Sequence, residues 1–296
     1  MNNILFEIMS RYIILPNVNY LRADGVDLGV DIYVPKDNFD ISGVDDFKKI
    51  KNIPTVVYFH GGGWVVGSKE ESTLKLLPYL SKGWAVVNVG YRKASEALAP
   101  SAVEDSRCAV WWVKRNAEKY GFNSDQIILT GHSAGGHLAL LAGILPASAG
   151  FDRRCPNLTG INSTLNRANA TLPELEVAAI INWAGITDVG DLIKEPNMRY
   201  YALMWLGSIQ NPELIAKRVS PLTYIRKGLP PILTLHGDKD VVVPYGHAVR
   251  LHDALEEMQT PNQLHTIKGK EHFDFSSDEW AESYSVVDAF ISKYVM

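Results

Sequence analysis

A serine between small residues marks the stretch of this sequence best suited to chemistry. The segment Ile127-Ile-Leu-Thr-Gly-His-Ser133-Ala-Gly-Gly136 runs from large apolar residues into Gly-x-Ser-x-Gly, and a helix-forming apolar run without proline follows. This order predicts a strand, a sharp turn and a helix, with the Ser133 hydroxyl raised at the helix N-terminus. A serine in that position can attack a carbonyl carbon, although the same short pattern also occurs in ordinary turns.

A serine hydroxyl needs a base to take its proton and a carboxylate to orient that base. Among the eight histidines, His272 is the best candidate base, because Gly269-Lys-Glu-His272 opens the loop after the last predicted strand. The candidate acid is Asp240 in the segment His236-Gly-Asp-Lys-Asp240, which also follows a strand. The other aspartate of that segment, Asp238, is expected to stabilise the loop by binding local backbone amides.

An acyl-transfer reaction also needs donors for the oxyanion of its tetrahedral intermediate. The segment His60-Gly-Gly-Gly-Trp64 exposes backbone without side chains, so the amides of Gly62 and Gly63 could converge with that of Ala134. A glycine triplet could instead be a simple loop or a phosphate cradle. No Gly-x-x-x-x-Gly-Lys-Ser/Thr or Gly-x-Gly-x-x-Gly pattern accompanies it, which argues against the cradle.

Alternating strand and helix patterns surround these residues. Apolar and β-branched runs predict strands over residues 28–33, 55–59, 85–89, 127–129, 177–183, 232–236 and 264–267. Helical spacing predicts helices over 71–81, from Pro100 to about 120, and over 278–294. The alternation predicts an α/β fold in one domain over residues 1–296, with a mostly parallel sheet of about eight strands covered on both faces. Chemistry in such sheets gathers beyond the carboxyl ends of the strands.

The connection over residues 184–220 is predicted to form a small cap insertion. It contains an aromatic cluster over residues 200–206 at helical spacing. In a cap, Trp205 would combine with Trp64, Trp183 and Val241 to bind the substrate in a narrow apolar acyl site. Aromatic residues at helical spacing are equally typical of a plain core, so both interpretations stay open.

Composition narrows the possible partners. The 296 residues are 46% hydrophobic and 21% charged, with a formal net charge of −4. These values are ordinary for a soluble globular protein and give no argument for nucleic acid or an anionic membrane as partner. No apolar run of ~18 residues is present, so no membrane span is expected. A cytoplasmic location and export with removal of a signal peptide both fit, and the oligomeric state is left open.

The two cysteines are expected to be free thiols. Cys108 lies in an apolar helical pattern and Cys155 in a polar loop, and their spacing fits neither a metal site nor a disulfide framework. Neither a metal nor an organic cofactor is expected. The long polar loop over residues 148–173 has no assigned role. Its formal glycosylation sequons are read as loop composition, and they begin at Asn157, Asn162 and Asn169.

Taken together, the motifs resemble those of bacterial carboxylesterases of the α/β-hydrolase superfamily. The resemblance extends from about Tyr20 to the C-terminus and is strongest to the branch with hormone-sensitive-lipase-like and acetyl or feruloyl esterases. The chain order Ser133, Asp240, His272 is the order of that superfamily. The motifs are His60-Gly-Gly-Gly-Trp64, Gly90-Tyr-Arg92, Gly131-His-Ser-Ala-Gly-Gly136, Ser220-Pro-Leu-Thr-Tyr224, His236-Gly-Asp-Lys-Asp240 and Gly269-Lys-Glu-His272.

The resemblance implies a serine carboxylic ester hydrolase that works through an acyl-enzyme on short-acyl esters. Acetylated or feruloylated carbohydrates are candidate substrates. By the same resemblance, Ser133, Asp240 and His272 form the triad, and Gly62, Gly63 and Ala134 supply the oxyanion donors. The segment after Arg92 departs from the family pattern, as does the 148–173 loop, and both departures bear on the substrate. The alternatives are an arylformamidase and a catalytically inactive binding module of the hydrolase fold.

Overall fold

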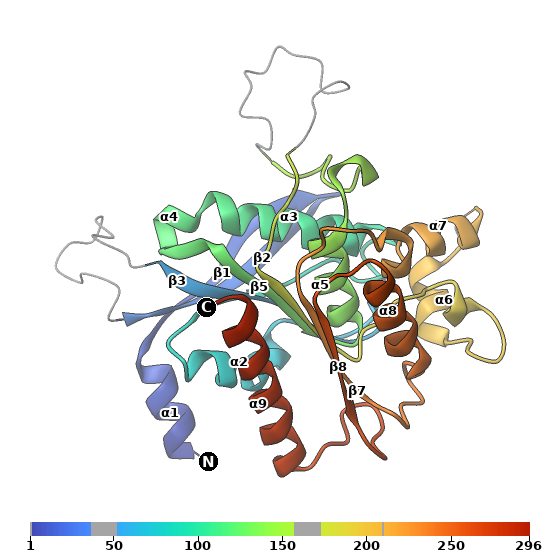
Figure 1. Cartoon of the computed structure of the whole chain (residues 1–296). Coiled ribbons are helices and arrows are strands. Elements are labelled where there is room, and N and C mark those ends of the chain that lie inside the picture. Colours follow the sequence, from blue (N-terminus) through green and yellow to red (C-terminus); the bar gives the residue numbers. More distant parts are fainter. Residues whose placement is uncertain (1, 37–51, 157–172, 209) are drawn as a thin grey trace.

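The structure is a computed structural model that describes residues 2–36, 52–156, 173–208 and 210–296. Within these residues, eight strands form one sheet in the order β1-β2-β4-β3-β5-β6-β7-β8 (Figure 1). The strands are β1 (Tyr12–Ala23), β2 (Val26–Pro35), β3 (Ile53–Phe59), β4 (Ala85–Val89), β5 (Phe122–His132), β6 (Ala179–Trp183), β7 (Ile232–Gly237) and β8 (Asn262–Ile267).

Strand directions match an α/β-hydrolase sheet. β2 runs antiparallel to β1 and β4, whereas all neighbouring pairs from β4 to β8 are parallel. The predicted mostly parallel sheet, with an early antiparallel strand around residues 28–33, is therefore confirmed. Parallel strands end at the same edge of a sheet, so the loops that follow β3, β5, β7 and β8 lie on one side of the molecule.

Helices cover both faces of the sheet (Figure 1). The faces are distinguished by two buried clusters, one including residues of α3, α5 and α8 and the other residues of α2 and α9. The α-helices are α1 (Asn2–Ser10), α2 (Thr73–Leu80), α3 (Ser101–Arg115), α4 (Ala117–Tyr120), α5 (Ala134–Ile144), α6 (Tyr200–Leu206), α7 (Pro212–Arg218), α8 (Gly246–Glu257) and α9 (Ser277–Tyr294). Short 3₁₀ helices are η2 (Glu70–Ser72), η3 (Ala147–Ala149), η4 (Asp191–Ile193) and η5 (Pro221–Tyr224).

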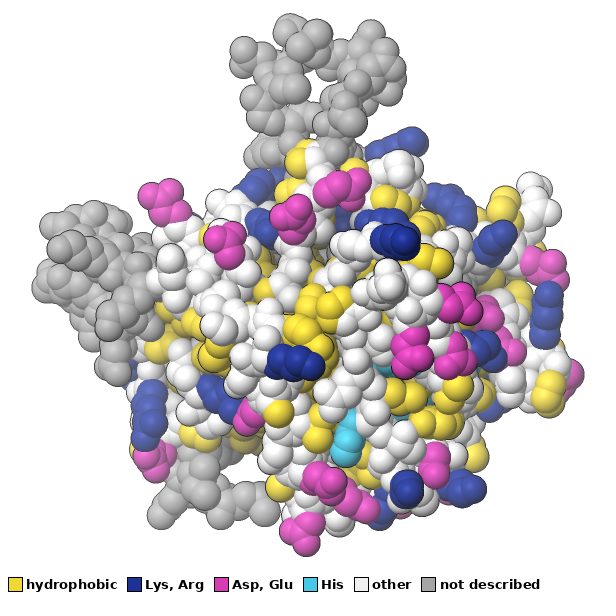
Figure 2. Space-filling model, viewed as in Figure 1, with side chains coloured by type: hydrophobic (Ala, Val, Ile, Leu, Met, Phe, Trp, Pro, Cys, Tyr) yellow, Lys and Arg dark blue, Asp and Glu magenta, His cyan; other side chains and the backbone are white. Residues whose placement is uncertain are grey.

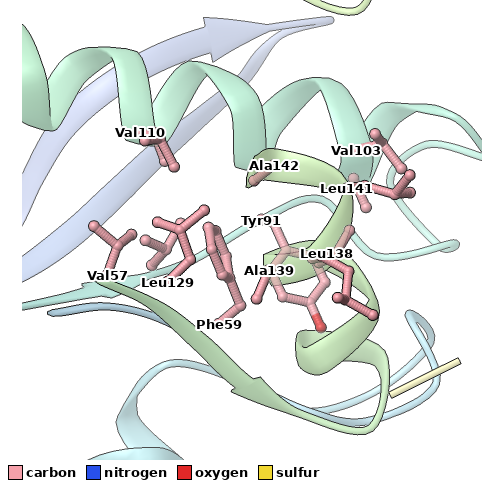
Figure 3. Close-up of a cluster of buried hydrophobic side chains, with 14 of the residues drawn as sticks. Val57, Phe59, Tyr91, Val103, Val110, Leu129, Leu138, Ala139, Leu141 and Ala142 are labelled. Carbon is pink, nitrogen blue, oxygen red and sulfur yellow. The ribbon is translucent and has the colours of Figure 1, made fainter. Parts of the chain in front are cut away.

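The core under α3 and α5 shows how the strand pattern builds the fold. Successive strand residues point to opposite faces, so Val57 and Phe59 of β3 pack on one side while Val56 and Tyr58 pack on the other. Figure 3 shows Val57, Phe59 and Leu129 of the sheet facing side chains of α3 and α5. Every residue of α5 is buried, as expected for a helix that is apolar on all sides. The helix that follows Ser133 is therefore held rigidly in the core.

Strand β1 was not predicted from the sequence. It contains Pro16, and its pairing with β2 shifts register between Leu15 and Val18 and again between Asn19 and Leu21. Proline lacks an amide donor and breaks the alternation that predicts a strand, but an edge strand tolerates it. β1 pairs only with β2 and forms this edge.

The predicted helix from Pro100 to about residue 120 is interrupted. Asn116 leaves helical geometry with φ −101° and ψ 12°, and it separates α3 from α4. Its side-chain amide donates to the backbone oxygen of Trp112 at 2.8 Å. The backbone hydrogen bonds from the Asn116 amide to Trp112 and from the Tyr120 amide to Asn116 continue through this position, so the interruption lies in the backbone angles of Asn116.

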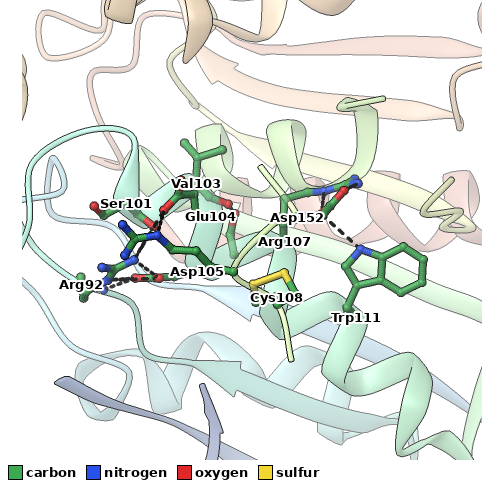
Figure 4. The surroundings of a disulfide bond; sticks show 12 residues. Arg92, Ser101, Val103, Glu104, Asp105, Arg107, Cys108, Trp111 and Asp152 are labelled. Atoms are coloured by element: carbon green, nitrogen blue, oxygen red, sulfur yellow. Dashed lines mark hydrogen bonds and ion pairs between the residues drawn. A yellow bond between two sulfur atoms is a disulfide. The ribbon is translucent and has the colours of Figure 1, made fainter. Parts of the chain in front are cut away.

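The expectation of two free thiols was wrong, because Cys108 and Cys155 form a disulfide (Figure 4). The bond joins α3 to the segment after η3 across a sequence separation of 47 residues. A second connection lies beside it, where the buried Arg107 guanidinium pairs with Asp152 at 2.5 Å. Asp152 also accepts from the Trp111 indole at 3.2 Å. Sequence spacing could not reveal a pair that only the docking of this segment on α3 brings together.

Other expectations concern the surface and the connections. No helix in the described ranges is long and apolar enough to cross a membrane. Figure 2 shows acidic and basic side chains interspersed on the visible face rather than gathered by sign. Residues 157–172 of the polar loop, with Asn157, Asn162 and Asn169, lie outside the described residues. In the predicted cap over residues 184–220, the described helices are η4, α6 and α7, and its role as a cap stays a prediction.

Candidate active site

Ser133 occupies the turn between β5 and α5 and has φ 58°. Residues other than glycine rarely adopt a positive φ, and those that do are often found at functional sites. The flanking glycines are required by close packing: a Cβ on Gly131 would lie 2.5 Å from the Gly135 carbonyl carbon, and one on Gly135 would lie 2.0 Å from the Phe59 oxygen. The Ser133 amide donates to the Trp183 oxygen at 2.8 Å. The backbone therefore fixes the serine at the sheet edge.

Asp240 and His272 are brought together by the loops after β7 and β8. Asp240 Oδ2 lies 2.6 Å from His272 Nδ1. The other carboxylate oxygen, Oδ1, accepts from the amides of Val242 at 2.8 Å and Val243 at 2.9 Å. The carboxylate is thus oriented by its own loop. Because Nδ1 of His272 faces Asp240, Nε2 is the ring nitrogen that points away from the carboxylate.

Electrostatics keep Asp240 ionised. Burial by itself would raise the pKa of Asp240, but hydrogen bonds from His236 and His272 together with the backbone amide of Val243 hold the pKa below its usual value. A carboxylate that stays charged can orient an imidazole and stabilise its protonated form.

Asp238 has a different position from Asp240. Its Oδ1 accepts from the Gly269 amide at 2.6 Å. Asp238 was expected to bind local backbone amides, but the amide that it binds belongs to the loop after β8 rather than to its own loop. Asp238 therefore connects the loop that carries Asp240 to the one that carries His272.

Aromatic rings connect the residue before Ser133 with His272. The His132 ring lies 4.9 Å from the Phe273 ring, which in turn lies 4.4 Å from the His272 ring. Within the described residues, no hydrogen bond of Ser133 Oγ is found. Hydrogen bonds between a nucleophile and its base are often long before substrate binds, so this arrangement remains compatible with a triad.

The glycine triplet lies directly beside the serine turn. A Cβ on Gly61 would lie 2.9 Å from the His132 oxygen and 3.6 Å from Ser133 Cβ. The loop is shaped by Gly62, whose φ is 121° and whose carbonyl oxygen accepts from the amides of Val65 and Val66, both at 3.0 Å. The predicted oxyanion donors are the amides of Gly62, Gly63 and Ala134, and none of them donates to another described residue.

The predicted substrate-binding residues lie in three different environments. Trp64 and Trp205 are fully buried and stack with ring centroids 4.1 Å apart. Trp183 is also fully buried, but it belongs to the cluster on the other face of the sheet and stacks on His132 at 5.1 Å. Val241 is 64% exposed. Their substrate-binding role stays a prediction.

Three other histidines near the site have structural partners. Burial lowers the pKa of His60 to about 4 and that of His137 to about 3. His137 accepts from the Trp64 indole at 3.2 Å and donates to the Val219 oxygen at 2.6 Å. Nδ1 of the His132 ring shares a hydrogen bond with the Tyr58 hydroxyl at 2.9 Å. These contacts leave His272 as the histidine with an aspartate partner and an exposed edge, with its side chain 16% exposed.

Two residues of the site were missed by the sequence analysis. Tyr201 of α6 covers Gly63, because a Cβ on that glycine would lie 2.8 Å from Tyr201 Cβ. Its hydroxyl donates to the Val242 oxygen at 2.9 Å. The second residue is His236, whose Nε2 lies 3.0 Å from Asp240 Oδ2. For His236, its place in the segment that contains Asp240 was an available signal. For Tyr201, the signal was the aromatic cluster over residues 200–206, which includes it.

The sequence matches a known protein family. The family model described as BD-FAE matches residues 31–255, which include the serine turn, the glycine triplet and Asp240. The chain belongs to the BD-FAE family. Esterase LipQ of Mycobacterium tuberculosis is 27% identical to this BD-FAE chain over 251 residues, which cover 84% of the chain and 57% of LipQ. The chain therefore spans little more than half the length of that relative.

Solved structures share the fold of this BD-FAE chain. Thermogutta terrifontis esterase 2 superimposes with a TM-score of 0.71 and 24% identity, covering 96% of this chain and 95% of that one. A truncated carbohydrate esterase from gut microbiota gives a TM-score of 0.72 at 24% identity, covering 95% and 98%. At this level of identity the likeness establishes the α/β-hydrolase fold.

Proposed function

We propose that this protein is a serine carboxylic ester hydrolase in which Ser133, His272 and Asp240 form the catalytic triad. The observation that carries the proposal is the 2.6 Å contact between Asp240 and His272 at the same sheet edge as the strained Ser133 turn. Membership of the BD-FAE family and likeness to LipQ support an ester as the substrate.

The reaction follows from these positions. His272 Nε2 takes the proton of Ser133 Oγ as the oxygen attacks the ester carbonyl carbon. The amides of Gly62, Gly63 and Ala134 donate to the oxyanion that forms. Collapse of the intermediate releases the alcohol, which takes the proton from His272 and leaves an acyl-serine. Water then attacks the acyl-serine by the same steps, and the acid is released.

The acyl group that fits this site is short. Tyr201 lies over Gly63 and binds the loop of Asp240, so it closes the space between the oxyanion donors and the acid. The Trp64 ring lies 5.9 Å from the Tyr201 ring and stacks on Trp205, so both indoles pack next to this wall. Each methylene that is buried adds ~0.8 kcal/mol, whereas displacing a packed aromatic ring costs ~1 to 3 kcal/mol. Structures of Thermogutta terrifontis esterase 2 with propionate and butyrate bound agree with short acyl groups on this fold.

The alcohol side is proposed to accept a larger group, such as the carbohydrate of an acetylated oligosaccharide. In a feruloylated carbohydrate the bulky feruloyl group is itself the acyl group, so the short acyl site favours the acetyl ester. The likeness to a carbohydrate esterase supports this substrate class. Rates on acetylated and feruloylated oligosaccharides, compared with aryl acetates and an aryl formamide, would rank the candidates. A preference for the formamide would replace the esterase proposal with amide hydrolysis.

The test of the mechanism is the Ser133→Ala variant, with Ser285→Ala on exposed α9 as the matched control. Ser133→Ala is expected to abolish turnover of p-nitrophenyl acetate with the far-UV CD unchanged, whereas Ser285→Ala keeps the wild-type rate. Paraoxon should add a diethyl phosphoryl group to the Ser133 peptide in the wild-type protein, detected by mass spectrometry. Activity of Ser133→Ala above a trace would overturn the acyl-enzyme mechanism.

A further inference from the structure

Two imidazoles contact the same oxygen of Asp240. Oδ2 lies 2.6 Å from His272 Nδ1 and 3.0 Å from His236 Nε2. His236 is the penultimate residue of β7 and is fully buried. His236 therefore contacts Asp240 from the buried strand β7, whereas His272 contacts it from a partly exposed loop.

The contacts of His236 determine which of its nitrogens carries the proton. Nε2 faces two acceptors, Asp240 Oδ2 and the Val243 oxygen, each at 3.0 Å. It must therefore carry a hydrogen. Nδ1 is buried without a partner among the described residues, so a proton there would be an unsatisfied buried donor. His236 therefore donates from Nε2 to Asp240.

Other titratable side chains lie close to His236 and Asp240. From the start of α8, the Tyr245 ring lies 5.7 Å from the His236 ring, and His247 is close enough to interact electrostatically with it. On the α6 side, Tyr201 binds the Val242 oxygen and is near Asp240. None of these groups donates to the carboxylate. Within the part of the chain that the structure describes, four groups donate to the Asp240 carboxylate, namely the amides of Val242 and Val243 and the two imidazoles.

We propose that His236 is a positioning residue that acts on His272 through Asp240. The hydrogen bond from His236 holds Oδ2 toward His272. It also stabilises part of the negative charge of the carboxylate. Because part of this charge is already stabilised, Asp240 does not take the proton from His272 during turnover. For the same reason, the carboxylate attracts a protonated His272 less strongly than it would without His236. The inference rests on the proposed function, since it assigns His272 as the base.

The substitution that tests this role is His236→Phe, which removes the donor and keeps an aromatic ring in the core. With one hydrogen bond fewer, the carboxylate attracts a protonated His272 more strongly. We expect kcat on p-nitrophenyl acetate to fall at least tenfold, with KM within about twofold of wild type. The acid limb of the kcat/KM profile should move upward by about half a pH unit or more.

Two further variants separate positioning from simple core packing. In His236→Gln the side-chain amide can still donate to Asp240, and we expect it to restore most of kcat and the wild-type acid limb. His252→Phe is the matched control, because His252 of α8 is another buried histidine and is bound at 2.7 Å to Oδ1 of Asn262, the first residue of β8. It should leave both kcat and the pH profile unchanged.

The possible outcomes decide between the proposals. If His236→Phe keeps the wild-type pH profile and kcat, His236 is a packing residue and the inference is wrong. If His236→Phe does not fold, His236→Gln is compared with His236→Asn, whose shorter side chain carries its amide less far toward Asp240. Identical pH profiles of kcat/KM in these two variants would overturn the inference. An NMR titration of His272 in these variants needs no substrate. A shift there without any esterase activity would overturn the proposed function and leave the His236 contact standing.

Discussion

The hydroxyl of Tyr201 donates to the backbone oxygen of Val242 at 2.9 Å and so joins α6 to the loop that carries Asp240. The same side chain lies over Gly63 of the glycine triplet. A single residue of the 184–220 segment therefore contacts both the proposed oxyanion loop and the proposed acid loop. This position makes Tyr201 the residue through which that segment would control the acyl site.

Replacing Tyr201 should change acyl-chain preference. In Tyr201→Ala the wall over Gly63 is removed, and the optimum on p-nitrophenyl esters of two to twelve carbons should move to longer chains. Tyr201→Phe keeps the wall and loses a hydrogen bond worth ~1 kcal/mol, so its chain-length profile should stay as in wild type. Measuring kcat/KM across the series checks both variants. Identical profiles in Tyr201→Ala and wild type would remove Tyr201 from the acyl site.

The two aspartates of the acid loop should differ sharply in their effect on rate. Asp240→Asn favours the wrong imidazole tautomer of His272, an effect of ~10⁴ in kcat in a well-studied triad. Asp238→Asn weakens only the bond to the Gly269 amide and should lower the free energy of unfolding by ~1 kcal/mol with a modest loss of rate. Steady-state kinetics and urea unfolding of both variants test the ranking. The reverse ranking would assign the acid to Asp238.

Gly63→Ala should impair the oxyanion loop. Gly63 has φ 58°, and the added Cβ would lie 2.8 Å from Tyr201 Cβ. Moving the loop misplaces a proposed donor, and loss of one such donor costs ~10²-fold in kcat. Gly228→Ala is the control, since Gly228 has φ 78° with no atom within 4 Å of the added Cβ. Equal rates for the two variants would argue against a role of this loop in catalysis.

The disulfide should contribute to stability. Closing a loop of this length typically stabilises a fold by ~2 to 4 kcal/mol. Cys108→Ser should lower Tm by several degrees, and Cys155→Ser should do the same. The double variant should be no less stable than either single variant, because both lose the same bond. Additive losses in the double variant would show that the two thiols are not paired in the native protein.

Stability should fall as the pH is lowered from neutral. Burial lowers the pKa of His137 to about 3 and the pKa values of His60 and His247 to about 4. An unfolded histidine takes up its proton near pH ~6.5, so between these values the unfolded chain binds more protons than the folded one. The free energy of unfolding should then drop by ~1.4 kcal/mol per pH unit for each such histidine.

Urea unfolding at several pH values between 7 and 5 measures this dependence. In His137→Gln the slope should be smaller by the contribution of one histidine, even if the variant is less stable overall. A slope equal to that of wild type would mean that His137 takes up its proton equally in the folded and unfolded chains.

The sequence alone determined the features that depend on local pattern. Glycines around Ser133 predict the sharp turn because only they fit its backbone, and apolar runs of strand length predict β3 to β8 because buried parallel strands need them. The order of Ser133, Asp240 and His272 then followed from the loops at the strand ends. These inferences hold because turn geometry and periodicity act over a few residues.

Only the tertiary structure decided which distant groups meet. The pairing of Cys108 with Cys155, the second imidazole on Asp240 and the contact of Tyr201 with Gly63 all depend on how separate elements dock. Strand β1 also required the whole sheet, since Pro16 hides its pattern and pairing with β2 makes it a strand. Burial also depended on docking. The aromatic cluster that contains Trp205 was equally typical of a pocket and of a core, and packing between α6 and the glycine loop buried Trp205 against Trp64.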